Sequence, residues 1–227
     1  AVVPYLKDTA VRNLAAELLY RLGGDAAGAV EPYLRDDDQD VRKMAVDTLG
    51  LLRHKDATAA IVPLLHDPDP NVVTSAVEAL GNIGSEAAVP RLIQVYEQEE
   101  YTRAVVAEAL GKIKGEQATE FLSKSFERAI EDNADPLTLF GIIEALGAIG
   151  DEKAFSLLVG HLPNVKGKLR RMMLAAIVWI ADKAHLSLDI PGAETEDLID
   201  LLEDSDLRVR LNVVKVLLGI WGAWKTE

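Results

Sequence analysis

One seven-residue segment returns along this chain at nearly even intervals. Its clearest copy, Glu-Ala-Leu-Gly-Asn-Ile-Gly, runs from Glu78 to Gly84. Related copies begin at four further acidic residues, Glu17, Asp47, Glu108 and Glu144. The successive intervals are 30, 31, 30 and 36 residues. Self-similarity at such a period is typical of repeat proteins, whose units each pack only on their neighbours. The sequence therefore predicts a stack of similar units.

Each copy lies at the end of a helical pattern. In the clearest copy, apolar residues recur at spacings that place them on one helix face: Val72, Val73, Ala76, Val77, Leu80 and Ile83. A glycine returns inside this helix at one register, at Gly50, Gly81, Gly111 and Gly147. Because an interior glycine costs about 1 kcal/mol relative to alanine, its return predicts close approach of a neighbouring helix. Gly23, Gly84 and Gly150 end their copies and predict left-handed helix caps.

Between these segments the pattern predicts seven pairs of helices and no strand. The first pair supplies residues 1–6 and 9–22. The others are 26–35 with 39–52, 57–66 with 70–83, 86–97 with 100–113, 116–131 with 137–149, 151–162 with 166–183, and 194–203 with 206–221. Such pairs bury their apolar faces only by stacking. We therefore expect one all-α solenoid domain over residues 1–227, with a minor break at the 184–193 linker.

Composition narrows the class of protein. The net charge of −13 is concentrated in the first 165 residues, which carry −12, and this argues against nucleic acid as a partner. No cysteine is present. The longest apolar run is far shorter than the ~20 residues of a membrane span.

We expect a cytoplasmic protein. Because the chain starts at Ala1, inside a predicted helix, we also expect it to be a piece of a longer one.

The residues around these helices resemble the HEAT-like repeats of phycobilin lyases. Asp40-Val41-Arg42 through Leu49-Gly50 carries the resemblance, as does the stretch from Asp69 to Gly81. It implies a right-handed superhelix of about seven antiparallel helix pairs. It also implies a ladder between units, built from an acid and an arginine six residues apart: Asp36/Arg42, Glu97/Arg103 and Asp204/Arg210.

Superposing the units reveals a row of acids. Glu17, Asp47, Glu78, Glu108 and Glu144 share one helix position, which becomes Ala175 and Lys215 in the last two units. The resemblance places the second helices on the inner, concave surface. The row is therefore interpreted either as an acidic groove for a basic segment of a partner or as a solvated face. Glu17/Arg21 and Glu108/Lys112, with spacing i,i+4, favour the second interpretation.

Large side chains at the inner register are further candidates for partner binding. They are Tyr101, Phe140, Trp179 and Arg171, and aromatic residues and arginine commonly anchor interfaces. Trp221 and Trp224 are interpreted as closing the end of the stack. The basic cluster near Lys166 is not flanked by an aromatic platform, so nucleic-acid binding is not favoured.

The sequence thus predicts a non-catalytic scaffold that binds another protein along an acidic groove. No histidine has a second ligand at a metal-binding helical spacing, so we expect neither a metal nor a cofactor. Two alternatives stay open, because HEAT-like repeats occur in proteins with unrelated functions. One is an enzyme of the phycobilin-lyase type, which requires a deep pocket with a titratable group. The other, a reader of damaged DNA similar to glycosylases, conflicts with the acidic row.

Overall fold

The computed structural model describes residues 2–8, 10–23, 26–132, 134–184, 186, 195–204 and 207–223. All regular secondary structure in these ranges is helical, which confirms the predicted all-α class. The chain divides into two compact units, Ala1–Ala118 and Thr119–Glu227. Most of the expected 184–193 linker and Trp224 lie outside the described residues, as does the side chain of Trp221. In the described part, no helix is both long and apolar enough to cross a membrane.

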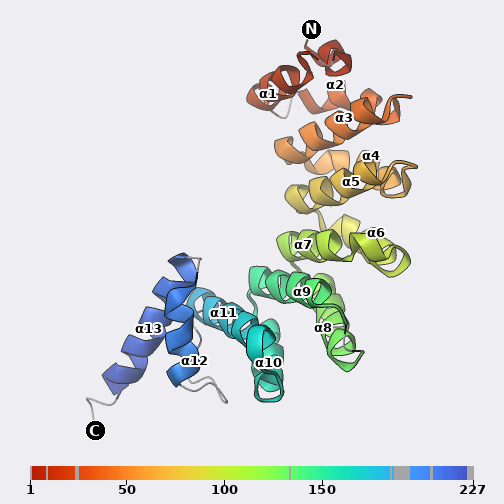
Figure 1. Cartoon of the computed structure of the whole chain (residues 1–227). Coiled ribbons are helices and arrows are strands. Elements are labelled where there is room, and N and C mark those ends of the chain that lie inside the picture. The colour runs from red at the N-terminus through yellow and green to blue at the C-terminus, as the bar shows by residue number, and fades with distance from the viewer. Residues whose placement is uncertain are drawn as a thin grey trace. The chain divides into compact units, whose positions relative to one another are not determined.

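Unit 1 is a stack of helix pairs (Figure 1). Its second helices, which pack on one another in sequence order, are α1 (Arg12–Leu22), α3 (Gln39–Leu52), α5 (Pro70–Ile83) and α7 (Arg103–Ile113). The first helices are shorter and mostly interrupted: η1 (Val3–Lys7), α2 (Ala27–Val30) with η3 (Glu31–Arg35), η4 (Lys55–Ala57) with α4 (Thr58–Ile61) and η5 (Val62–His66), and η6 (Glu86–Ala88) with α6 (Val89–Gln98). A short η7 (Glu100–Thr102) leads into α7.

Unit 2 continues the pattern with longer helices. Its elements are α8 (Glu116–Glu131, which begins within unit 1), α9 (Pro136–Ile149), α10 (Glu152–His161), η8 (Leu162–Asn164), α11 (Gly167–Ala184), α12 (Thr195–Asp200), η9 (Leu201–Glu203) and α13 (Leu207–Ala223). Helix α11 packs against α9 on one side and α13 on the other. The second helices α9, α11 and α13 are again direct neighbours.

Local chemistry explains where these helices begin and break. Asp38, Asp69 and Asp135 cap α3, α5 and α9 by accepting hydrogen bonds from backbone N–H groups of the first turn. A proline follows two of these caps, at the first position of the helix. A backbone N–H at this position has no acceptor within the helix, so proline loses no hydrogen bond there. In the first helices Pro32 and Pro63 lie inside the helical run, and there the chain changes from α to 3₁₀ geometry, because proline donates no hydrogen bond.

The recurring glycines allow second helices of unit 1 to pack closely, as predicted. A Cβ on Gly50 would lie 2.8 Å from the Cα of Ala79 in α5, and one on Gly81 would lie 2.8 Å from the Cα of Ala109 in α7. Both distances are shorter than ordinary van der Waals contact. The equivalent Gly147 in unit 2 is less crowded, since its Cβ would lie 3.5 Å from Ala176.

The predicted glycine caps are only partly correct. Gly84 and Gly150 adopt the left-handed helical conformation, with φ values of 70° and 69°. Gly23 has φ 76° but ψ −161°, so it leaves the helix in a more extended conformation.

An arginine links neighbouring pairs in unit 1. Arg42 donates from Nη1 to the carbonyl oxygen of Asp36 at 2.8 Å, and from Nε and Nη2 to the carboxylate of Asp67 at 2.8 and 2.9 Å. Asp67 belongs to the following pair. The carboxylate of Asp36 instead pairs with Lys7 at 2.5 Å. The residue six positions before Arg42 therefore supplies a backbone carbonyl, while the carboxylate that pairs with Arg42 comes from the next helix pair.

The other two predicted ladder pairs differ from each other. Arg210 Nη1 donates to the carbonyl oxygen of Asp204 at 3.0 Å, which repeats the backbone bond of Arg42. Arg103 lies 3.6 Å from the carboxylate of Glu100, and its guanidinium is 6.0 Å from the centre of the Tyr96 ring. Glu97 is exposed and has no recorded bond to Arg103 in the described structure. Sequence reasoning did not identify Arg170 as a link between helix pairs, although its Nη2 donates to the carboxylate of Asp197 at 2.6 Å.

The Arg42–Asp67 pair should make stability depend on pH. Its hydrogen bonds hold the pKa of Asp67 below the ordinary value of an aspartate, so near that value the unfolded chain binds more protons. The stabilisation is fully present above about pH 4 and is lost as pH falls through the lower folded pKa. We expect the stability difference between the wild type and Asp67→Asn to shrink below about pH 4, as measured by urea unfolding. A difference that does not change with pH would contradict this.

Candidate functional site

Four of the predicted acids belong to the second helices of unit 1. Glu17, Asp47, Glu78 and Glu108 come from α1, α3, α5 and α7, and all four are exposed or half-exposed. The opposite sides of these helices carry buried leucines such as Leu49, Leu80 and Leu110. We call the exposed sides of these four helices the second-helix face of unit 1. Because the helices are neighbours in the stack, this face presents one acid per pair.

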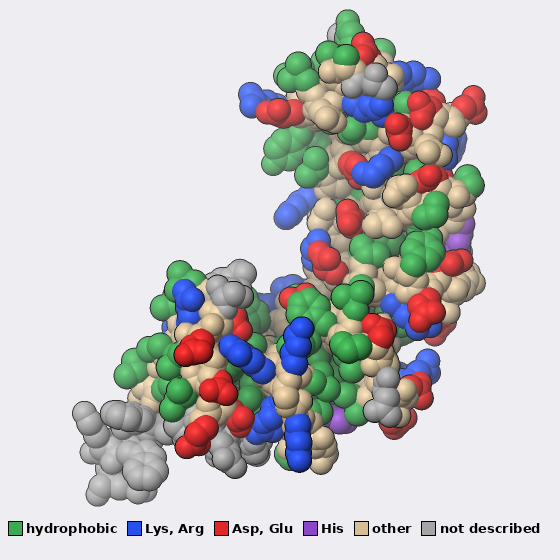
Figure 2. All heavy atoms as spheres, in the orientation of Figure 1, with side chains coloured by type: hydrophobic (Ala, Val, Ile, Leu, Met, Phe, Trp, Pro, Cys, Tyr) green, Lys and Arg blue, Asp and Glu red, His purple; other side chains and the backbone are tan. Residues whose placement is uncertain are grey.

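Most of this acidic charge is compensated locally. Arg21 donates to Glu17 at 2.7 Å, Lys43 to Asp47 at 2.8 Å, and Lys112 lies 2.7 Å from Glu108, each pair within one helix. Figure 2 shows acidic and basic side chains interspersed over the visible side of unit 1. Among the described residues, Glu78 makes no recorded hydrogen bond or ion pair. The predicted i,i+4 pairs are therefore present, and Lys43, four residues before its acid, adds a third.

Unit 2 contains a pocket between its second helices. It has a volume of about 860 Å³ and lies between α9, α11 and the start of α13. Helix α9 contributes Phe140, Ile143, Glu144, Gly147 and Ala148; helix α11 contributes Lys168, Arg171, Met172, Ala175, Ala176 and Trp179; Asp204 and Val209 complete the lining. This volume falls in the range of sites that bind ligands or peptide side chains.

Small side chains create the hollow. Ala175 occupies the helix position at which the five preceding helix pairs carry Asp or Glu, and Gly147 and Ala176 meet beside it. A Cβ on Gly147 would still lie 3.5 Å from Ala176, so the two helices are less tightly packed there than α3 and α5 at Gly50. The pocket therefore arises where the acidic row is interrupted and the helix contact is looser.

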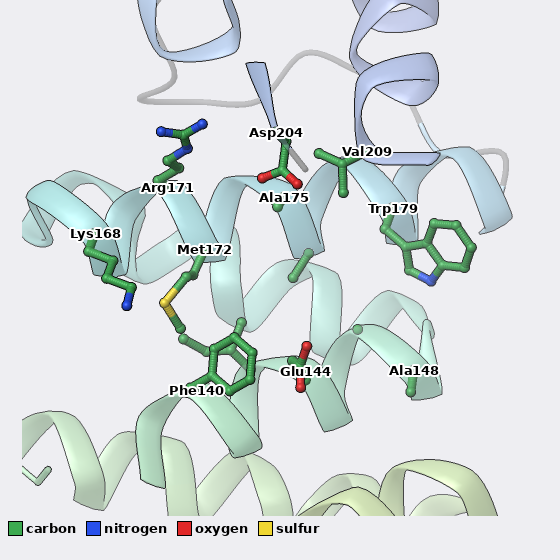
Figure 3. Close-up of a pocket in the computed structure, with 13 residues that line it drawn as sticks. Phe140, Glu144, Ala148, Lys168, Arg171, Met172, Ala175, Trp179, Asp204 and Val209 are labelled. Atoms are coloured by element: carbon green, nitrogen blue, oxygen red, sulfur yellow. The ribbon is translucent and has the colours of Figure 1, made fainter. Parts of the chain in front are cut away.

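Aromatic and charged groups surround this hollow (Figure 3). Met172 points toward Phe140, and Trp179 lies at the opposite end of the pocket from Lys168. Lys168 is exposed and makes no recorded ion pair or hydrogen bond within the described part of the chain. Arg171 donates one bond, from Nη2 to the carbonyl oxygen of Asp200 at 3.2 Å. One end of the pocket therefore carries two cations, and the other an indole ring.

The structure brings four of the predicted binding residues together. Phe140, Glu144, Arg171 and Trp179 all line the pocket, and Asp204, predicted for the ladder, lies at its edge. Asp47, Glu78, Glu108 and Tyr101 belong to unit 1, where Tyr101 is 56% exposed. Sequence reasoning did not single out Met172 or the hollow at Ala175. Comparing the sizes of side chains at this register would have found the hollow.

The described histidines and acids form no group of three suited to holding a metal ion. His161 is part of the packing, because its Nδ1 lies 3.0 Å from the carbonyl oxygen of Leu157 and its ring meets Phe126 edge to face. His161 therefore has a structural role in unit 2.

Comparison with known proteins agrees with this architecture. Stacked helix pairs define the class as an α-solenoid. The sequence matches the family model of HEAT repeats over residues 28–103 and 97–179, which cover most of the chain. The chain therefore belongs to the HEAT-repeat family, and the resemblance noted from the sequence is confirmed. None of the curated proteins matches it.

Solved structures share this fold. The CpcE–CpcF complex of phycocyanin lyase from Nostoc sp. PCC7120 is 21% identical, with 96% of this chain and 92% of that chain covered and a TM-score of 0.56. A HEAT-like repeats protein from Thermococcus onnurineus NA1 is 14% identical, with coverages of 95% and 94% and a TM-score of 0.53. An engineered protein is 20% identical, covers 86% and 98%, and has a TM-score of 0.51. At these identities the likeness concerns the fold alone.

Proposed function

We propose that this chain is a non-catalytic module that binds another protein through the exposed sides of its second helices. The observation that carries the proposal is the pocket of unit 2, where Phe140, Trp179 and Arg171 surround a hollow. Aromatic residues and arginine are enriched at protein interfaces, because they combine large contact area with hydrogen bonding. A surface of this kind is suited to recognition rather than to solvation alone.

The second-helix face of unit 1 supports the same proposal. Glu78 offers a carboxylate without a recorded ion pair, and Leu14 and Leu51 on α1 and α3 are 57% and 54% exposed. A partner with a basic segment would be attracted to Glu78 and would share the local pairs of Asp47 and Glu108. Since such pairs are already satisfied, we expect the acids to contribute orientation and association rate more than affinity.

Charge reversal on this face tests the proposal. We expect the double variant Glu78→Lys/Glu108→Lys to capture its partner about tenfold less than the wild type, because like charges placed opposite each other oppose binding. The measurement is quantitative mass spectrometry of proteins retained by the immobilised full chain from an extract of the cells that make it. Both residues are exposed, so the variant should fold.

The matched control reverses two exposed acids of the first helices, Glu86 and Glu97, in the same unit. It changes the net charge equally and leaves the second-helix face intact. We expect this control to retain the partners of the wild type. Equal loss of capture in both variants would attribute binding to net charge, and unchanged capture in both would remove unit 1 from the interface.

A further inference from the structure

The pocket of unit 2 has the features of a site for a particular kind of peptide. At its centre is the small side chain of Ala175, at the position where each of the five preceding helix pairs carries an acidic side chain. The floor beside it is made of Gly147 and Ala176. An apolar side chain of a partner could occupy this hollow and bury its surface there, which is favourable by about 25 cal/mol per Å².

The charges at the pocket favour an acidic ligand. Lys168 has no recorded partner among the described residues, and Arg171 uses one N–H for the Asp200 carbonyl. The two acids of the pocket, Glu144 and Asp204, each already interact with other groups of the chain. Each of these two cations is suited to a carboxylate, because charge-assisted hydrogen bonds are stronger than neutral ones.

The spacing along α11 sets the pattern of the ligand. Arg171, Ala175 and Trp179 follow one another at intervals of four residues, which is about 6 Å per step along a helix. An extended peptide rises about 3.3 Å per residue, and every second side chain points to the same side. A residue that pairs with Arg171 is therefore followed by one over Ala175 two positions away, and by one at Trp179 four positions away.

We propose that this pocket binds an extended segment of a partner protein with an acidic residue, a bulky apolar residue two positions away and an aromatic or aliphatic residue four positions away. The acid pairs with Arg171, at the end of the pocket that also carries Lys168; the second residue fills the hollow at Ala175, and the third packs on Trp179. The pattern can be read in either chain direction. This inference rests on the proposed function, and it specifies the chemistry of the partner segment that contacts the pocket of unit 2.

A selection from random peptides tests the inference. Twelve-residue peptides displayed on phage are selected on the full chain, and the same library is selected on the variant Ala175→Glu. Because Glu occurs at the equivalent position of four other helix pairs, this variant should fold. The added carboxylate should fill the hollow and repel an acidic peptide. We expect peptides with the acid–x–apolar–x–apolar pattern to be enriched on the wild type only.

Affinities of the enriched peptides then separate the contribution of the hollow at Ala175 from that of the charge on Lys168. By fluorescence anisotropy we expect Ala175→Glu to weaken binding more than tenfold. We expect Lys168→Glu to weaken it about tenfold at low salt and less at high salt, because exposed charges are screened. The matched control is Ala104→Glu, the same change at a half-exposed position of α7 in unit 1, and it should bind as tightly as the wild type.

Several outcomes would overturn the inference. Enrichment of basic peptides would assign the pocket to a ligand of the opposite charge, and equal enrichment on Ala175→Glu would place binding elsewhere. A selection that enriches no peptide over the variant would show that the pocket is not a peptide site. If no peptide is enriched on the wild type over Ala175→Glu, while the full chain still captures proteins that Glu78→Lys/Glu108→Lys loses, this inference fails and the proposed function stands.

Discussion

Replacing Arg42 with alanine should lower the free energy of unfolding by about 3–5 kcal/mol. In the wild type only 6% of the Asp67 side chain is exposed, and the variant leaves this carboxylate without its bidentate partner. It also removes the bonds to the carbonyl oxygens of Asp36 and Asp37. Breaking a buried ion pair on one side is costly because the remaining charge is desolvated and uncompensated.

Urea unfolding followed by circular dichroism measures this loss, and Arg103→Ala is its control. Arg103 occupies the equivalent position of a later pair, but its ionic partner Glu100 is 83% exposed and 3.6 Å away. An exposed pair of this kind contributes less than about 1 kcal/mol. Equal destabilisation by the two variants would show that the bonds from Arg42 to the next helix pair contribute no more to stability than the exposed pair of Arg103.

The second large effect is expected at Gly81. Alanine has a helix propensity better than glycine by about 1 kcal/mol, so Gly81→Ala would stabilise an isolated helix. In the stack, the added methyl group would lie 2.8 Å from the Cα and 2.9 Å from the Cβ of Ala109. Because α7 must move to relieve this contact, we expect a net destabilisation of about 1–3 kcal/mol.

Gly147→Ala is the matched control for this prediction. Its methyl group would lie at an ordinary contact distance of 3.5 Å from Ala176, so the gain in helix propensity should dominate. We expect a variant as stable as the wild type or more stable by up to about 1 kcal/mol. Thermal unfolding of the two variants under one condition decides the matter, and a stabilised Gly81→Ala would refute the role given to the recurring glycine.

The helices were predictable because their ends are chemically marked. The pattern predicts helices over 39–52 and 70–83, and the structure has α3 at Gln39–Leu52 and α5 at Pro70–Ile83. Asp38 and Asp69 cap these helices directly before their first turns. The 3₁₀ segments within the first helices were not predicted, although Pro32 and Pro63 mark them. Local signals of this kind depend only on neighbouring residues.

The site was predictable only in part, since its depth depends on distances between helices. Superposing the helix pairs places Phe140, Glu144, Arg171 and Trp179 on the same side of their helices, within one turn of the acidic register, and all four line the pocket. The hollow arises from the looser contact at Gly147, although the same glycine in unit 1 marks a close contact. In the same way, the spacing of six identifies Arg42 but not Asp67, because that carboxylate comes from another helix pair.

Capture of a partner by the face variants tests the central claim most directly, namely that the exposed sides of the second helices are the binding surface. The comparison requires three proteins under one condition: the wild type, Glu78→Lys/Glu108→Lys and Glu86→Lys/Glu97→Lys. We predict that the first and third retain the same proteins in similar amounts and that the second retains about tenfold less. The claim is contradicted if the second binds as well as the wild type while the third does not.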